Sequence, residues 1–434
     1  MNHPTEPLET YRWGKEFRSR LFKEASQSAE SDKLLVIGNM NFPKEIVTGL
    51  GDFSYLAGES YAVSVIREGG AELAQACAEE TERRGFARDL CAYVRYSWGS
   101  MFLDRNPWGG AFPSNAKFVM SFMNCETRGK WFQVMARHLG IPHLSLDCGF
   151  DESGQGPEYQ QHCVDYISQQ LEGLAEQMEK ITGKRYDWDA FVEGVANRYL
   201  ARCYLVEAFK LNGVIPAPME QKLWLPFLMI NEWVPYKAET VAIMKALCDE
   251  LKSRVARGIA ADPQERIRLT HEGMSPYHSL FMFTYLRQRG VAMMGWAGNI
   301  HHAISSVEPD ENGGFSIESP ILWDRVPRNK AEALHHLAYH EFIEDREHIN
   351  PKQRAHSLTS VLRHWKADGA IFVMDRGCAY YSTGVLDVKR LVQAAGIPTM
   401  IYEGNRVDAR EWSWPHVQDA LDTFLESLGV TSRT

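Results

Sequence analysis

The chain has 434 residues, of which 44% are hydrophobic and 24% charged, an ordinary globular balance with room for two or three domains. The formal net charge of −9 argues against a nucleic-acid-binding protein, because such a protein needs a basic surface. We also expect no membrane span, because the most apolar stretch, residues 223–234, is short and is interrupted by Pro226 and Glu232.

The residues after the N-terminus predict a charged helix over 9–29, followed by an α/β region. Short apolar runs are typical of buried parallel strands. In this region they predict strands at 34–38, 61–66, 117–123 and 142–146, with helices at 71–84 and 129–139. Strands that alternate with helices indicate a parallel sheet with helices on its faces.

A turn-rich segment at 151–157 separates this region from a helical one of roughly a hundred residues. Within it, Gly183 ends one predicted helix and Asp187 is the expected N-cap of the next. A second α/β region follows. It contains candidate strands at 266–269, 291–294, 370–374 and 398–402 and a helix at 385–395.

These elements predict an α/β fold with two Rossmann-like (flavodoxin-like) parallel-sheet domains and a helical insert domain. We place the boundaries as follows: an N-terminal helical arm at 1–32, a first α/β domain at 33–150, the insert at 151–256 and a second α/β domain at 257–434.

The chain contains eight cysteines. Its N-terminus lacks a basic segment followed by an apolar one, so we expect no secretory signal and a cytoplasmic location. Cysteines in a reducing compartment seldom form structural disulfides. No two of them have the C-x-x-C spacing of zinc fingers or ferredoxin-type clusters, so a metal site has to combine cysteines from distant segments.

Two of these cysteines follow the same local pattern. Residues 118–120 and 372–374 are both Phe-Val-Met, and they lead within five residues to Cys125 and within four to Cys378. A cysteine at the carboxyl end of a parallel strand lies where ligands bind, and the following helix start favours its thiolate. Cys91 is a third candidate. A cysteine at a strand end is more often a packing residue, so the pattern alone leaves both interpretations open.

The segments around these cysteines resemble a known family. Residues 85–95, 123–132 and 375–378 are similar to the three cluster-binding segments of the benzoyl-CoA reductase and 2-hydroxyacyl-CoA dehydratase family. Residues 402–410 resemble its closing Glu-Gly-Asp-Arg type of motif, with Asn405 where many members carry Asp. The resemblance implies a [4Fe–4S] cluster on Cys91, Cys125 and Cys378, with one iron open to a further ligand.

Within the family, segments 93–100 and 257–261 look most like the larger cluster-binding subunit of ATP-dependent benzoyl-CoA reductase. This likeness implies reduction of an aromatic acyl-CoA to a cyclic diene, together with a homologous cluster-binding subunit and ATP-dependent activator subunits. The chain itself lacks the G-x-x-x-x-G-K-[ST] loop of ATP-hydrolysing proteins.

Two alternatives remain open. One is a subunit of a 2-hydroxyacyl-CoA dehydratase, which removes water without net reduction. The other is a non-catalytic or double-cubane electron-transfer subunit of the same family, in which Cys148 would support a larger cluster.

For catalysis we name Arg376, which is close in sequence to Cys378 and offsets negative charge, and Glu126, which follows Cys125 and delivers protons. Arg128 is a second candidate for the charge-offsetting role. His335, His336, His340 and Glu341 have helical spacing without the H-E-x-x-H order of a zinc site, so we expect them on a solvated helix face.

Overall fold

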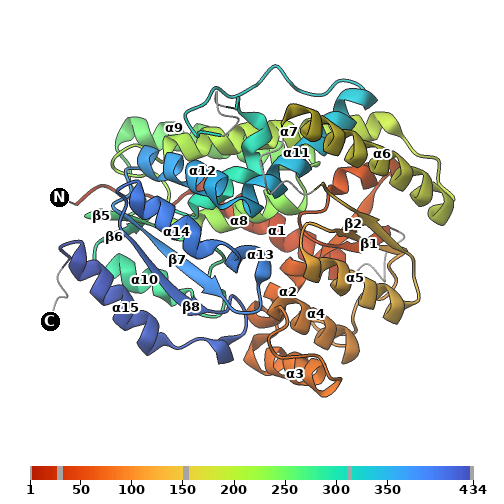
Figure 1. The fold of residues 1–434 in the computed structure, drawn as a ribbon, viewed down its shortest axis with the longest axis horizontal. Helices are drawn as coiled ribbons and strands as arrows, with labels where there is room; N and C mark the ends of the chain where they lie inside the picture. Colours follow the sequence, from red (N-terminus) through yellow and green to blue (C-terminus); the bar gives the residue numbers. More distant parts are fainter. Residues whose placement is uncertain (1, 27–32, 150–155, 310–314, 431–434) are drawn as a thin grey trace.

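The computed structural model of the chain describes residues 2–26, 33–149, 156–309 and 315–430. Figure 1 shows two β-sheets near opposite ends of the long axis, with helices α7, α9 and α11 along one side of the molecule. None of the described helices is both long and apolar enough to cross a membrane.

Both sheets are parallel and have the same strand order. The first sheet has the order β2-β1-β3-β4 and the second β6-β5-β7-β8. In each sheet, the strand that comes second in the sequence is at the edge, and the strand that comes first lies next to it. The first contains β1 (Leu34–Gly38), β2 (Phe53–Ala57), β3 (Phe118–Phe122) and β4 (His143–Leu146). The second contains β5 (Ile267–Glu272), β6 (Val291–Met293), β7 (Gly369–Asp375) and β8 (Thr399–Gly404). This repeated order confirms the predicted α/β class with two Rossmann-like units.

The helices fall into three groups along the chain. The first is α1 (Glu9–Ser26), η2 (Lys44–Leu50), α2 (Gly58–Arg67), α3 (Gly70–Arg83), α4 (Ala92–Phe102) and α5 (Glu126–Leu139). The second is α6 (Pro157–Thr182), α7 (Trp188–Leu211), α8 (Gln221–Trp233) and α9 (Ala238–Arg257). The third is α10 (Phe281–Gln288), η3 (Ala297–Ser306), α11 (Lys330–Ile349), α12 (Pro351–His364), α13 (Ala379–Ser382), α14 (Val385–Ala394), η4 (Ala409–Glu411) and α15 (Trp414–Ser427).

The predicted helix limits between the sheets are confirmed. Gly183 caps α6 in the left-handed conformation (φ 69°), which glycine adopts readily. The Asp187 side chain accepts hydrogen bonds from the first backbone N–H groups of α7. Residues 27–29 of the predicted first helix lie outside the described residues, as does most of the 151–157 turn. The four domain boundaries stay a prediction.

One predicted strand is wrong. Residues 61–66 belong to α2, and the strand of this region is instead β2 at 53–57. The polar residues of α2 are mostly outside the predicted window, and within 61–66 only Ser64 is polar. A short apolar run of this kind has the same pattern as a buried strand.

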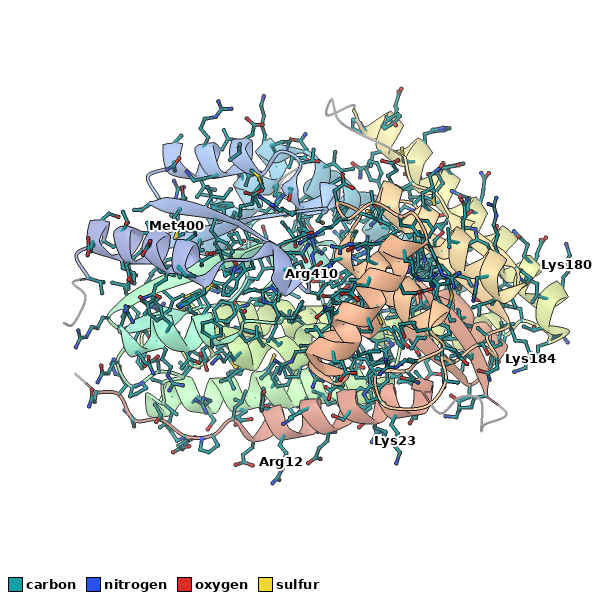
Figure 2. All side chains as sticks on the ribbon, turned by 90° about the horizontal axis from the view of Figure 1, so that it is seen from below. Arg12, Lys23, Lys180, Lys184, Met400 and Arg410 are labelled. Atoms are coloured by element: carbon teal, nitrogen blue, oxygen red, sulfur yellow. The ribbon has the colours of Figure 1, made fainter. Side chains whose placement is uncertain are left out.

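A buried ion-pair network joins the two halves. Arg95 of α4 is fully buried, and its Nη1 lies 2.8 Å from Oδ2 of Asp408 in the loop after β8. Arg410 pairs with the same carboxylate at 2.7 Å and with Glu82 of α3 at 2.8 Å. In Figure 2, Arg410 lies between the blue C-terminal ribbon and the orange helices of the first half. Asp408 therefore joins segments that are more than 300 residues apart.

We expect Asp408 to make the fold sensitive to acid. Burial opposes its ionisation, but hydrogen bonds from Arg410 and Arg95 outweigh burial and lower the pKa of Asp408 to about 2. The ordinary pKa in the unfolded chain is higher, so ionised Asp408 stabilises the fold fully above about pH 4. This contribution, about 2 kcal/mol, is lost as the pH falls toward 2. Asp408→Asn should lower stability at pH 7 and reduce the loss between pH 4 and 2, as measured by urea unfolding across this range.

Asp249→Asn is the control for this variant. It removes one partner of the exposed Lys245–Asp249 pair on α9 and should leave the urea midpoint nearly unchanged, because exposed pairs contribute little. Equal acid sensitivity in the wild-type chain and the Asp408→Asn variant would contradict the assignment.

Candidate active site

Three cysteines occupy the same position, the N-cap, at the starts of three helices. Cys91 immediately precedes α4, Cys125 precedes α5 and Cys378 precedes the short helix α13. In each case the cysteine carbonyl accepts a backbone hydrogen bond from its own helix. Cys125 and Cys378 follow β3 and β7, the equivalent strands of the two sheets, as the sequence pattern predicted.

A close backbone contact places Cys378 beside Cys91. Gly377 has φ 72°, and a Cβ at this position would lie 2.7 Å from the carbonyl oxygen of Asp89. Only glycine therefore allows the two turns to pack directly. Burial raises the pKa of the Cys91 thiol to about 12; the charge of Arg406 opposes burial, and the charges of Cys378 and Cys125 add to it. The three thiols thus lie within electrostatic reach of one another.

Arg406 supplies a buried positive charge beside the cysteines. Against the effect of burial, its charge lowers the pKa of both Cys91 and Cys378. Its Nε lies 2.5 Å from Oδ2 of Asp375, and its guanidinium carbon is 4.9 Å from the ring centroid of Tyr93. Within the described part of the chain, Nη2 of Arg406 is buried and has no hydrogen-bond partner. This donor can therefore bind an anionic group. Sequence reasoning missed Arg406, although the closing motif contains it.

Arg128 is a second buried cation, three residues after Cys125. Its Nε lies 2.9 Å from Oε1 of Glu59, and its Nη1 donates to Oδ1 of Asn124 at 2.7 Å. Burial lowers the pKa of Arg128, but the charges of Glu59 and Cys125 outweigh burial and raise it. Arg128 therefore keeps its charge in this environment.

A pocket, called here the interlobe pocket, lies between the carboxyl ends of the two sheets. Each cysteine-capped helix contributes one residue of its first turn to the lining: Tyr93, Arg128 and Tyr381. Arg406 comes from the loop after β8, and Asn41 from the loop after β1. The apolar lining includes Val63, Leu225, Leu228, Met229, Met274 and Trp296. Ligands of open parallel sheets bind at this edge of the strands.

The two residues named for catalysis lie elsewhere. Glu126 is the exposed first residue of α5. Arg376 is 55% exposed and pairs with Glu403 at 2.7 Å on the surface. Neither is among the described residues that line the interlobe pocket. Their catalytic roles stay predictions, as does a cluster role for Cys148, which lies after β4 beside Tyr166.

The prediction of a solvated face on α11 is confirmed for His335, which is exposed, but is wrong for His340 and Glu341. His340 and Glu341 are fully buried instead of solvated, and side-chain atoms of His340, Glu341 and Glu344 lie within 4.8 Å of one another. The reason is tertiary: α11 packs against α7, whose Arg198 lies 2.5 Å from Glu341. Helical spacing alone does not show which face a neighbouring helix covers.

Asn405 connects the closing motif to the turn that contains Arg376. Its Nδ2 donates to the carbonyl of Arg376 at 3.1 Å and to Oε2 of Glu411 at 2.9 Å. Its Oδ1 accepts from the backbone N–H groups of Val407 and Asp408. Both ends of the amide are therefore used, and an aspartate cannot reproduce the two donated bonds.

Comparison with known proteins places this site in a family context. The profile of the family described as 2-hydroxyglutaryl-CoA dehydratase, D-component, matches residues 39–428. The (R)-2-hydroxyisocaproyl-CoA dehydratase alpha subunit of Clostridioides difficile is 25% identical, over 89% of this chain and 88% of its own. The (R)-phenyllactyl-CoA dehydratase alpha subunit of Clostridium sporogenes is 23% identical, over 89% and 87%. One of the benzoyl-CoA reductase subunits of Thauera aromatica is 21% identical, over 80% and 79%.

The residues of the site fit the iron–sulfur cluster that the resemblance implies. Thiolates are the ligands of such clusters, and three thiols from distant segments lie within electrostatic reach of one another here. A buried, anionic cluster needs compensating charge and hydrogen-bond donors, and Arg406 supplies both. The number of thiols leaves room for one non-cysteine ligand.

We expect Asn405→Asp to destabilise this chain. The new carboxylate loses both donated hydrogen bonds and faces Glu411, so the cost should be roughly 1–3 kcal/mol at pH 7 by urea unfolding. Adding Glu411→Gln should recover part of this loss, because it removes the repulsion and supplies a donor. An Asn405→Asp variant as stable as the wild-type chain would show that the amide bonds contribute little.

Proposed function

Since the chain belongs to the 2-hydroxyglutaryl-CoA dehydratase D-component family, whose matched relatives are subunits of acyl-CoA enzymes, we propose that it is the iron–sulfur subunit of an ATP-dependent benzoyl-CoA reductase. The observation that carries the proposal is that three helix-capping cysteines lie within electrostatic reach of one another and that the first turns of their helices line one pocket. In this proposal Cys91, Cys125 and Cys378 bind a [4Fe–4S] cluster, which when bound transfers single electrons at low potential and offers an open iron position.

The two buried arginines suit a thioester substrate. Adding an electron to an aromatic acyl-CoA places negative charge on the ring and on the thioester oxygen. Nη2 of Arg406 is buried without a hydrogen-bond partner among the described residues, and Arg128 keeps its charge in the pocket wall. A fixed positive charge in a site of low dielectric stabilises such an anion more strongly than water does.

The apolar wall suits a ring. Leu225, Leu228 and Met229 of α8 line the pocket together with the rings of Tyr93 and Tyr381. These side chains exclude water from the reacting carbons, so protons reach the ring only from positioned groups. Apolar walls with a few polar groups are typical of sites that bind small organic molecules.

We infer two kinds of partner. The relatives are named as subunits, which supports a second, homologous cluster-binding chain. The chain has no phosphate-binding loop of the G-x-x-x-x-G-K-[ST] type, so an ATP-dependent activator has to supply the electrons.

A 2-hydroxyacyl-CoA dehydratase subunit is the second candidate. Sequence identity favours it: the dehydratase relatives are 22–25% identical to this chain, and the reductase relative is 21% identical. The same cysteines and arginines would then bind a hydroxyacyl thioester, and the products distinguish the two reactions.

We expect Cys91→Ala, Cys125→Ala and Cys378→Ala each to lose most of the iron found in the anaerobically purified wild-type protein. The loss follows because a cubane with two protein thiolates is poorly held. Iron analysis and electron paramagnetic resonance spectroscopy measure it. Cys148→Ala is the matched control and should keep its iron, while loss of iron in that variant alone would favour a different or larger cluster.

We expect the wild-type chain, with its partner subunit and activator, to convert benzoyl-CoA to a cyclic diene thioester. Mass spectrometry of the products tests this, with a 2-hydroxyacyl-CoA as the second substrate. An enoyl-CoA from the hydroxyacyl-CoA, with benzoyl-CoA unchanged, would identify a dehydratase. Arg406→Gln should lower activity with either substrate, because it removes the charge beside the pocket.

A further inference from the structure

A second cavity, called here the α1 cavity, lies beside the interlobe pocket and is not used in the function proposed above. It has a volume of about 730 Å³, and its walls come from α1, from Glu68 after α2 and from the loop 108–115. Arg18 of α1 connects the two spaces. It lines the α1 cavity, and its Nη1 donates to Sδ of Met229, which lines the interlobe pocket, at 3.7 Å.

Arg18 is a cation with unused hydrogen-bonding capacity. Its Nε is buried and has no hydrogen-bond partner in the described ranges, and the sulfur that its Nη1 contacts is a weak acceptor. Burial lowers the pKa of Arg18, but a guanidinium keeps its proton in proteins. A partly buried charge without a strong acceptor is costly, and an anionic ligand removes that cost.

The charges around the α1 cavity favour an anion. Arg18 and Lys23 line it, against one carboxylate among the described lining residues, that of Glu68. Arg67 is close enough for its positive charge to act on Arg18, so it adds a third cation. The chain as a whole has a net charge of −9, so this local excess of positive charge departs from its average. Phosphate groups are anions that arginine and lysine bind in proteins.

The lining also contains an aromatic wall. The ring centroid of Trp108 lies 4.9 Å from that of Phe22 and 6.0 Å from that of Tyr61, and Phe22 and Phe112 line the cavity beside it. These contacts hold the indole in place, and it is only half-buried. A fixed aromatic side chain is a stacking surface for a nucleobase. The α1 cavity thus combines phosphate-binding cations with a ring on which a base can stack.

Helix α2 forms a wall common to both cavities. Ser60 and Val63 line the interlobe pocket, and Glu68, one residue beyond the end of the helix, lines the α1 cavity. With a rise of 1.5 Å per residue, these positions are roughly 8–12 Å apart along the helix axis. The pantetheine arm of coenzyme A, which joins the thioester to the diphosphate, is long enough to span this distance.

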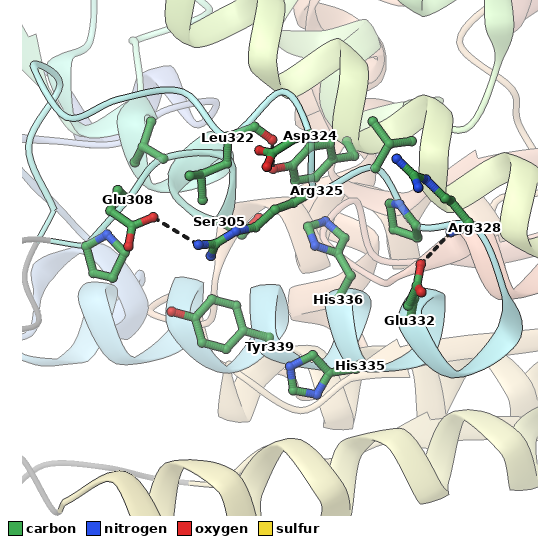
Figure 3. A pocket seen from close by; sticks show the side chains of 15 residues that line it. Ser305, Glu308, Leu322, Asp324, Arg325, Arg328, Glu332, His335, His336 and Tyr339 are labelled. Carbon is green, nitrogen blue, oxygen red and sulfur yellow. Dashed lines mark hydrogen bonds and ion pairs between the residues drawn. The ribbon is translucent and has the colours of Figure 1, made fainter.

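Another cavity, of about 560 Å³ beside α11, suits a nucleotide less well (Figure 3). Its lining contains more carboxylates than guanidinium groups: Glu308, Asp324 and Glu332 against Arg325 and Arg328. Arg325 already pairs with Glu308 at 3.1 Å. The fully buried His340 and Glu341 separate this end of α11 from the end beside the interlobe pocket, so the helix offers no open path between the two cavities.

We propose that the α1 cavity binds the nucleotide end of the acyl-CoA substrate, with its phosphates on Arg18 and Lys23 and its adenine ring against Trp108. The pantetheine arm then passes Met229 to the interlobe pocket. This inference rests on the acyl-CoA substrate of the proposed function, but ring reduction and dehydration both use one, so it does not depend on which reaction is catalysed. Binding of the nucleotide holds the thioester in position beside Arg128 and Arg406.

The test compares ligands with and without the nucleotide, in the anaerobically purified complex with its partner subunit. Coenzyme A is the first probe, because it carries the nucleotide whatever the acyl group. Arg18→Gln and Lys23→Gln should each weaken its binding on the order of tenfold, since each removes a charge-assisted hydrogen bond to phosphate. Binding of benzoyl-N-acetylcysteamine, a thioester without the nucleotide, should stay the same. Isothermal titration calorimetry measures both affinities.

Arg12→Gln is the matched control. Figure 2 shows Arg12 near the start of α1 and Lys23 near its other end. Arg12 is exposed and lines neither the α1 cavity nor the interlobe pocket, so its variant should bind coenzyme A as the wild-type complex does. Lys23 is also exposed, so Lys23→Gln keeps the fold even if Arg18→Gln does not. Adenosine 3′,5′-bisphosphate should compete with coenzyme A in the wild-type complex.

The outcomes separate the nucleotide site from the proposed reaction. Unchanged affinity of Lys23→Gln for coenzyme A, equal weakening of both probes, or failure of the bisphosphate to compete would each overturn the α1 cavity as the nucleotide site. If binding depends on Lys23 as expected but the wild-type complex converts neither benzoyl-CoA nor a 2-hydroxyacyl-CoA, the proposed function fails and the nucleotide site stands.

Discussion

The site depends on how the two α/β halves are held together. Cys91 and Cys378 come from different halves, and neither sheet alone places one beside the other. Two contacts fix the junction: the buried Arg95–Asp408 ion pair and the backbone approach of Gly377 to Asp89. A buried ion pair with good geometry tolerates little displacement, because a shift leaves a charge uncompensated at a cost of several kcal/mol. The relative position of Cys91 and Cys378 is therefore set by the Arg95–Asp408 ion pair together with the backbone contact beside the two cysteines.

The interior of this protein is unusually rich in charge near that junction. Arg95, Arg128, Arg198 and Arg406 are all buried, and each pairs with a carboxylate from another element. Such pairs add little to the net free energy of folding, because the cost of desolvating both charges offsets much of their attraction. They instead favour one arrangement of the packed elements over others. Around a reacting anion the same arrangement has a further consequence. Fixed cations in a dry site stabilise developing negative charge without reorganisation.

The two sheets share a strand order, but the connections between equivalent strands differ. Cys125 and Cys378 follow equivalent strands, β3 and β7. The connection before β3 contains α4 and Cys91, whereas the connection before β7 contains η3, α11 and α12. The same topological position thus supplies Cys91 in one half and the buried His340, Glu341 and Glu344 of α11 in the other. Both connections lead to the interlobe pocket, since Tyr93 and Trp296 line it from the two sides.

The sequence alone determined the class of fold, seven of the eight described strands and the position of Cys125 and Cys378 after strands, because apolar runs and residues at strand ends are local features. Cys91 does not follow a strand and was named through the family resemblance. It did not distinguish α2 from a strand, since the short apolar run at 61–66 fits either element. Burial of His340, the pairing of Arg376 with Glu403 and the role of Arg406 were decided by tertiary structure. Each depends on which element packs against the residue, and contacts between segments hundreds of residues apart leave no periodic signal in one sequence.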